Sequence, residues 1–97
     1  MKIEWDERKN KSNLRKHGLD LADADPMFDG PMLALPDDRE EYGENRWIGI
    51  GVTHGRIAVV AFAEGGEACV RVISLRKANQ RERKLFEETI AHKLEEG

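Results

Sequence analysis

Basic side chains crowd one stretch of this chain between positions 71 and 84, which reads R-V-I-S-L-R-K-A-N-Q-R-E-R-K. Nucleic-acid phosphates are bound by local basic surfaces, so this clustering is informative although the net charge is only −3. Arg71 and Arg76 suit phosphate best, because a guanidinium group binds phosphate oxygens in a bidentate manner and stays protonated. The stretch therefore predicts contact with the phosphates of RNA or DNA.

The same residues suit one particular reaction. RNA is cleaved without a metal when its own 2′-hydroxyl attacks the adjacent phosphate, and the protein must then position the strand, neutralise charge and move two protons. Arg71 and Arg76 would neutralise the charge, while Glu82 and His17 are the titratable candidates for proton transfer. Each of these two has a structural alternative. Glu82 closes a capping box that begins at Asn79, and His17 lies at a helix end, where the dipole favours it.

Four further side chains are candidates for RNA contact: Arg46, Trp47, Lys77 and Arg83. An indole stacks on bases, and the three cations can reach phosphates. Other roles stay open for three of them. Trp47 could line the core or a groove, Arg46 could pair with Asp37 or Asp38, and Arg83 has the spacing of a surface pair with Glu87.

Charge is segregated along the chain. Residues 1–17 carry +3 and residues 46–85 carry +5, whereas residues 18–45 hold one cation against nine carboxylates. This bipolar pattern favours a nucleic-acid face on one side and a basic partner segment on the other. A solvated surface with randomly clustered charge is the alternative.

The composition limits the remaining possibilities. We expect residues 1–97 to form a single domain in the cytoplasm, without a membrane span or a signal segment. The single cysteine, Cys69, has no partner in the chain and fits a reducing compartment. The three histidines show no metal-ligand spacing, and no phosphate or dinucleotide loop is present, so we expect neither a metal nor a cofactor.

Hydrophobic periodicity and capping residues predict an α+β fold in the order β-α-α-β-β-β-β-α. Asp6 and Asp20 are expected to cap two N-terminal helices, with Gly18 ending the first and Pro26 shortening or kinking the second. We expect an antiparallel twisted sheet of about four strands with all three helices packed on it. The predicted strands are Lys2–Trp5, Met32–Leu35, Arg46–Thr53, Ile57–Glu64 and Glu67–Ser74, followed by a helix over Gln80–Leu94.

Two short turns predict the strand registers. His54-Gly55 would pair Ile50 with Val59, and Gly65-Gly66 would pair Val60 with Arg71. The core face would then carry Ile48, Ile50, Val52, Ile57, Val59, Ala61, Val70 and Val72. The opposite face would form a shallow groove for single-stranded RNA, with Trp47, Gly49, Gly51, Val60, Phe62, Cys69 and Arg71.

The chain resembles the BrnT family of toxins from bacterial type II toxin–antitoxin systems. The stretches that carry the resemblance are I-E-W-D-E-R-K at 3–9, N-L-R-K-H-G at 13–18, D-R-E-E-Y-G-E-N-R-W-I-G-I-G at 38–51, R-V-I-S-L-R-K-A at 71–78 and Q-R-E-R-K-L-F-E-E at 80–88. The sequence departs from the family pattern at Pro26, at Leu75, where small residues are common, and at Phe86, where tyrosine is common.

The resemblance implies a RelE-like fold and a ribonuclease that arrests translation. It also implies neutralisation by a BrnA-type antitoxin, usually in a 2:2 complex that binds operator DNA through the antitoxin. By position, Arg71, Arg76, Glu82 and Arg83 fall where such toxins place their active residues, and His17 falls in the N-x-x-K-H-G signature. The alternatives are a non-catalytic nucleic-acid-binding or regulatory module, and a degenerate toxin that acts only as a protein-binding partner.

Overall fold

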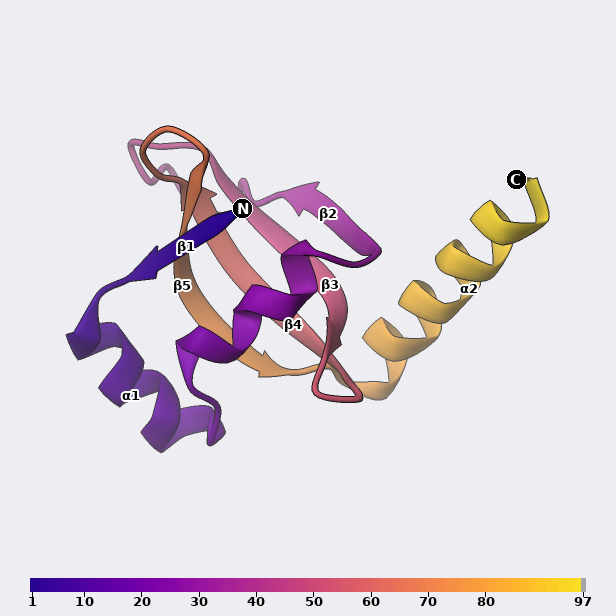
Figure 1. Ribbon diagram of the computed structural model, residues 1–97, viewed down its shortest axis with the longest axis horizontal. Helices are drawn as coiled ribbons and strands as arrows, with labels where there is room; N and C mark the ends of the chain where they lie inside the picture. Colours follow the sequence, from indigo (N-terminus) through magenta and orange to yellow (C-terminus); the bar gives the residue numbers. More distant parts are fainter. Residues whose placement is uncertain (97) are drawn as a thin grey trace.

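The computed structural model describes the backbone of residues 1–96 and the side chains of residues 1–93. The predicted order of elements is confirmed, with the second helix formed as a 3₁₀-helix (Figure 1). The elements are β1 (Lys2–Trp5), α1 (Glu7–His17), η1 (Leu21–Phe28), β2 (Met32–Pro36), β3 (Arg46–Thr53), β4 (Arg56–Glu64), β5 (Cys69–Lys77) and α2 (Gln80–Glu96). None of the helices in this described part of the chain is long and apolar enough to cross a membrane.

The strands form one mixed sheet of five strands in the order β1-β5-β4-β3-β2. The prediction of about four antiparallel strands is wrong at one edge, where β1 pairs with β5 in parallel from Lys2↔Cys69 to Trp5↔Val72. A parallel pair requires a long connection, and here most of the chain lies between the two strands. The position of β1 therefore depends on contacts with a strand that lies far away in the sequence.

The predicted helix caps are confirmed. The Asp6 carboxylate accepts a hydrogen bond from the Arg8 N–H at 2.8 Å, and the Asp20 carboxylate accepts one from the Ala22 N–H at 2.9 Å. Gly18 ends α1 in the left-handed region at a φ of 70°, which a glycine adopts without steric cost. These short-range signals fix where the two N-terminal helices begin and end.

One predicted strand register is confirmed and the other is wrong. In the β3–β4 hairpin His54 and Gly55 both have positive φ, and Ile50 pairs with Val59. The β4–β5 connection instead spans the four residues 65–68, and a bulge in β4–β5 shifts the pairing further. As a result Val60 pairs with Leu75, not with Arg71.

The main hydrophobic core lies under α1 and η1, on the sheet face that was predicted to be an open groove. A Cβ atom at Gly49 would lie 2.5 Å from the Met32 sulfur, so this glycine makes room for a core side chain and does not line a groove. The predicted RNA groove is therefore wrong, because side chains of η1, the following strand and the segment after α1 fill it. The buried members of this core are Leu19, Leu21, Ala24, Met27, Ala58, Val60, Val72 and Leu75.

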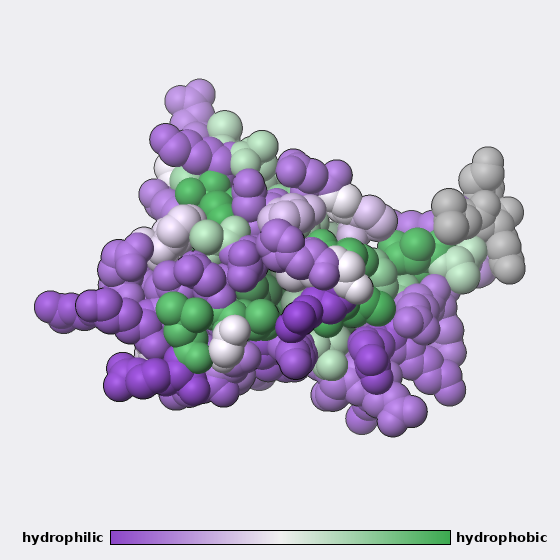
Figure 2. Space-filling model, turned by 60° about the horizontal axis from the view of Figure 1, so that its bottom comes forward, coloured by the Kyte–Doolittle hydropathy of each residue, from purple (hydrophilic) through white to green (hydrophobic). Residues whose placement is uncertain are grey.

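A smaller cluster on the other sheet face holds α2. Phe86 is buried against Ile50 and Val59, with Ile57 and Ile90 partly buried beside them. Beyond this anchor α2 projects away from the sheet, so it covers only one end of that face (Figure 1). Figure 2 shows apolar patches across the middle of the molecule, interrupted by polar side chains. The expectation that all three helices pack along the sheet is thus only partly met.

Asn13 links α1 to the sheet. Its side-chain oxygen accepts the Leu75 N–H at 3.0 Å, and its amide nitrogen donates to the carbonyl oxygens of Leu75 and Leu19 at 2.8 Å each. The side chain is buried, so these bonds satisfy backbone groups that water cannot reach. The N-x-x-K-H-G stretch therefore has a structural role through Asn13.

Candidate functional site

Three predicted site residues, Arg46, Arg71 and Arg76, share one face of the sheet, which we call the arginine face. Arg46 and Arg71 are both paired with Ala63 of β4, from opposite sides, and Arg76 is paired with Val59. Because side chains alternate along a strand, these positions point to the face that α2 partly covers. The four-residue turn and the bulge thus bring together cations that the predicted registers had separated.

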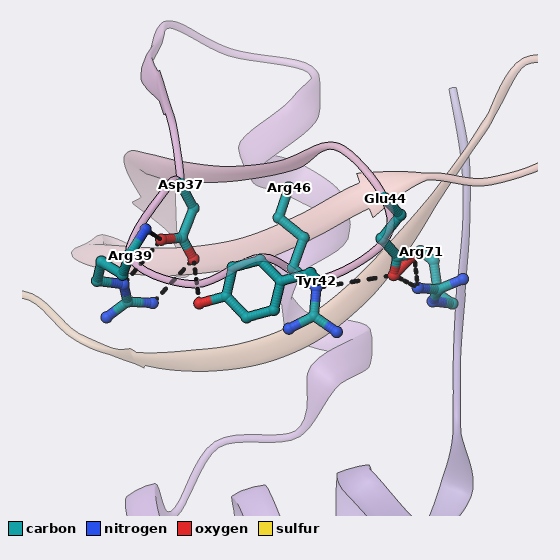
Figure 3. A network of polar contacts seen from close by, with 6 residues as sticks. All are labelled: Asp37, Arg39, Tyr42, Glu44, Arg46 and Arg71. Atoms are coloured by element: carbon teal, nitrogen blue, oxygen red, sulfur yellow. Dashed lines mark hydrogen bonds and ion pairs between the residues drawn. The ribbon is translucent and has the colours of Figure 1, made fainter.

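Glu44 joins two of these arginines. Both of its carboxylate oxygens accept hydrogen bonds from the terminal nitrogen Nη2 of Arg71, and the Nε atom of Arg46 lies 3.7 Å from one of them (Figure 3). The hydrogen bond from Arg71 is the main reason why the pKa of Glu44 is lowered. The same contact raises the pKa of Arg71, to which Glu4 on β1 adds a smaller effect. Arg71 and Glu44 are therefore both charged at neutral pH.

The loop of residues 37–45, which carries Glu44, is held by its own polar contacts. The buried Asp37 carboxylate accepts hydrogen bonds from Arg39 at 2.8 and 2.9 Å, and these lower its pKa. The Tyr42 hydroxyl reaches the same carboxylate at 3.4 Å. The Tyr42 ring in turn lies 4.0 Å from the Arg46 guanidinium (Figure 3). The predicted pairing of Arg46 with Asp37 or Asp38 is not formed, because Tyr42 and Glu44 surround its guanidinium instead.

Arg76 lies within β5, and not at the strand-to-helix break where the predicted strand end would place it. Its two terminal nitrogens donate to the two carboxylate oxygens of Glu82, each at 2.8 Å. The predicted capping box is confirmed as well, because Glu82 accepts the Asn79 N–H at 2.9 Å and donates its own N–H to the Asn79 side chain at 2.7 Å. Hydrogen bonding from Arg76, followed by that from Asn79, lowers the pKa of Glu82 against the effect of burial.

The remaining predicted residues lie apart from this group. His17 ends α1, which packs on the opposite face of the sheet, and in the described part of the chain no hydrogen bond joins it to the arginines. Trp47 is paired with Phe62 and so also faces away from Arg71. Lys77 is exposed at the end of β5, and Arg83 is exposed in the first turn of α2. The structure therefore groups Arg46, Arg71, Arg76 and Glu82, and separates His17 and Trp47 from them.

Glu44 and Tyr42 were missed by reasoning from the sequence. Both lie between the predicted strands Met32–Leu35 and Arg46–Thr53, in the acidic stretch for which the charge pattern predicts only contact with a basic partner segment. The signal that could have found them is the stretch Y-G-E-N-R at 42–46, in which an aromatic ring and a carboxylate precede a site arginine. The contact with Arg71 bridges 27 positions and has no local signature.

Comparison with known proteins identifies the family. Residues 5–82 match a family described as the ribonuclease toxin BrnT of type II toxin–antitoxin systems. Comparison with curated protein sequences gave no match. Among solved structures, the chain is similar to the 1.1 Å crystal structure of the ribonuclease toxin BrnT from Brucella abortus, with 38% sequence identity and a TM-score of 0.67. That match covers 82% of this chain and 99% of the Brucella chain. On this evidence, the chain belongs to the BrnT family of ribonuclease toxins of type II toxin–antitoxin systems.

Proposed function

We propose that this chain is a toxin that cleaves RNA internally by 2′-hydroxyl attack, without a metal, and so arrests translation in the cytoplasm. The observation that carries the proposal is the convergence of Arg46, Arg71 and Arg76 on the arginine face. Three permanently charged groups on one sheet face supply both the binding of a phosphate backbone and the stabilisation of charge on the reacting phosphorus. Membership of a ribonuclease family agrees with RNA as the substrate.

The spacing of these cations suggests how a strand would lie. Arg71 and Arg76 are five positions apart on β5, which corresponds to roughly 15 Å along the strand. Their guanidinium groups are held by carboxylates at opposite ends of the face, Arg71 by Glu44 and Arg76 by Glu82. We assign them to different phosphates of one RNA strand, with Arg83 adding a contact beside Arg76. Lys77 is paired with Ala58 and points to the opposite face, so it would contact the strand only at the end of β5.

Glu82 is the candidate proton acceptor beside Arg76. While it accepts two hydrogen bonds from Arg76 its pKa is lowered, which makes it a weak base. A phosphate that binds Arg76 would replace those bonds and leave Glu82 next to the reacting group with a higher pKa. His17, on the far side of the sheet, would serve only if the RNA strand passed around the end of β5.

An antitoxin partner follows from the type II family, and we propose that it is BrnA-like, neutralises this chain in a 2:2 complex and binds operator DNA itself. The acidic residues between positions 18 and 45 offer a surface for a basic segment of such a partner. Co-expression with the neighbouring gene, followed by measurement of the mass of the complex, tests the stoichiometry. A stable complex with another ratio would contradict it.

Cleavage of two matched RNAs tests the enzymatic proposal. The purified chain is incubated with a single-stranded RNA and with the same sequence carrying 2′-O-methyl groups, each with and without EDTA. We expect cleavage of the first RNA only, unchanged by EDTA, with 2′,3′-cyclic phosphate ends. Binding of both RNAs without cleavage would favour the non-catalytic module. Absence of binding, together with normal growth when the chain is expressed alone, would favour the degenerate toxin.

A further inference from the structure

We infer that the Glu44 side chain is an internal competitor of phosphate, so that its carboxylate occupies the anion site of Arg46 and Arg71 until a substrate phosphate displaces it. The inference rests on the proposed function in that it identifies the competing anion as RNA phosphate. The geometry supports it independently, because two guanidinium groups approach one carboxylate on a solvent-accessible face. A carboxylate and a phosphate use the same guanidinium donors.

Glu44 leaves part of the site unsatisfied. The Nε atom of Arg46 is buried and has no hydrogen-bond partner, since the nearest Glu44 oxygen lies 3.7 Å away. Such a buried donor is uncommon in a folded protein. The Glu44 carboxylate accepts hydrogen bonds from Arg71 and lies too far from the Nε atom of Arg46 to accept one from it as well. A phosphate group, with more acceptor oxygens in a tetrahedral arrangement, is suited to accept from both arginines at once.

The residues that position Arg46 are held in place without any contact from Glu44. The Arg46 guanidinium lies on the Tyr42 ring, and Tyr42 is positioned by Asp37, which Arg39 also holds. The Asp37 N–H donates to the carbonyl oxygen of Arg46 at 2.8 Å, which ties the loop to the start of β3. Rotation of the Glu44 side chain would therefore open the site without displacing the loop.

Gly43 sets the position from which Glu44 reaches the site. It adopts a φ of +73°, a conformation that turns the chain between Tyr42 and Glu44 and that other residues adopt at a cost. No atom lies within 4 Å of the Cβ position there, so the glycine is required by the backbone turn and not by a lack of space. The turn returns the chain toward β5, where Arg71 lies.

Displacing the Glu44 carboxylate from Arg71 should cost little free energy. The side chains of Arg71 and Glu44 are 37% and 30% exposed, and ion pairs with this access to water are screened. Competition of this strength lowers the affinity for a phosphate by a few-fold without abolishing it. The competition lowers the affinity for a free phosphate ion and for an RNA strand by the same factor, and the strand keeps its further contact with Arg76.

The test compares Glu44→Gln with Glu41→Gln. Both substitutions remove one negative charge from the same loop, but the Glu41 side chain is exposed and makes no hydrogen bond or ion pair with the arginines in the described part of the chain. Inorganic phosphate is titrated while the Nε–H signals of Arg46 and Arg71 are followed by NMR. Binding of the 2′-O-methyl RNA, which resists cleavage, is measured in parallel. Thermal unfolding of each variant confirms that it is folded.

We expect Glu44→Gln to raise the affinity for both probes by roughly threefold, and Glu41→Gln to leave it nearly unchanged. The double variant Glu44→Gln/Arg71→Ala should lose this gain in affinity. An unchanged or lower affinity in Glu44→Gln would overturn the inference, because Glu44 would then position the arginines. An equal gain in Glu41→Gln would overturn it too, since general charge would explain the effect. A gain in phosphate affinity without RNA cleavage by any variant would count against the ribonuclease proposal alone.

Discussion

Arg76 and Glu82 are joined by two parallel hydrogen bonds of 2.8 Å across the junction between β5 and α2. The same carboxylate accepts the Asn79 N–H at 2.9 Å, so it caps the helix and orients a site cation at once. The local structural role and the electrostatic role of Glu82 are therefore not alternatives. Glu82 thus links the start of α2 to the orientation of Arg76.

Glu82→Gln should destabilise the chain by about 1 kcal/mol at neutral pH, because the cap remains while the charge beside Arg76 is lost. The effect is small because the Arg76 side chain is 41% exposed and solvent screens the pair. The pKa of Glu82 is lowered from its ordinary value of 4.5, so its stabilising contribution is present above that pH and is lost as the pH falls through the lowered pKa.

Urea unfolding of the parent chain and of Glu82→Gln at neutral pH and near pH 3 measures this effect. The difference in unfolding free energy between the two should shrink at the acidic pH, because below pH 4.5 the unfolded chain takes up a proton at Glu82 more readily than the folded chain does. Glu88→Gln, at an exposed position on the same helix, serves as the control and should show no such change. If the unfolding free energies of the parent chain and Glu82→Gln differed by the same amount at both pH values, the contact with Arg76 would not stabilise the fold.

Asn13→Ala should cost about 3 kcal/mol of folding free energy, because it leaves buried backbone groups of Leu75 and Leu19 without partners. Ser12→Ala, on the same helix, removes a hydroxyl group that makes no hydrogen bond with the described residues. Its effect on the folding free energy should therefore be close to zero. Chemical unfolding of both variants checks the contrast. Equal stabilities would mean that Asn13 does not link α1 to β5.

Phe86→Ala should release α2 from the sheet, because Phe86 is 5% exposed and fills the cluster with Ile50 and Val59. A loss of about 3 kcal/mol is expected for removing a buried aromatic side chain. Leu85→Ala changes the neighbouring residue, which is 45% exposed, and should cost about 0.5 kcal/mol. Hydrogen exchange should show protection lost along α2 in the first variant only. Full protection of α2 in Phe86→Ala would contradict the proposed anchor.

Features that depend on neighbouring residues were predictable from the sequence. The caps at Asp6 and Asp20, the stop at Gly18 and the His54-Gly55 turn all arise within a few positions, and the structure confirms each of them. The capping box at Glu82 belongs to the same class.

Features that depend on long-range pairing were not predictable. Gly65-Gly66 predicts a two-residue turn, but the chain uses four residues, and this places Arg71 on the other face. A bulge between Arg71 and Arg76 then brings Arg76 to the same face. The parallel pairing of β1 with β5 joins the two ends of the sequence and leaves no pattern in either strand. For the same reason no sequence pattern links Glu44 to Arg71, which lies 27 positions away.

The rate of RNA cleavage by arginine variants tests the central claim most directly. At an RNA concentration below saturation, Arg76→Ala should lower the rate of cleavage by about 100-fold, the typical effect of removing a group that stabilises transition-state charge. Arg71→Ala, which removes a contact with a different phosphate, should lower the rate by about tenfold through weaker RNA binding. Arg81→Ala removes an exposed cation in the first turn of α2 and should leave the rate within about twofold, since surface charges contribute little. Cleavage by Arg71→Ala and Arg76→Ala at the rate of the parent chain would contradict the claim that the arginine face is the site of a ribonuclease.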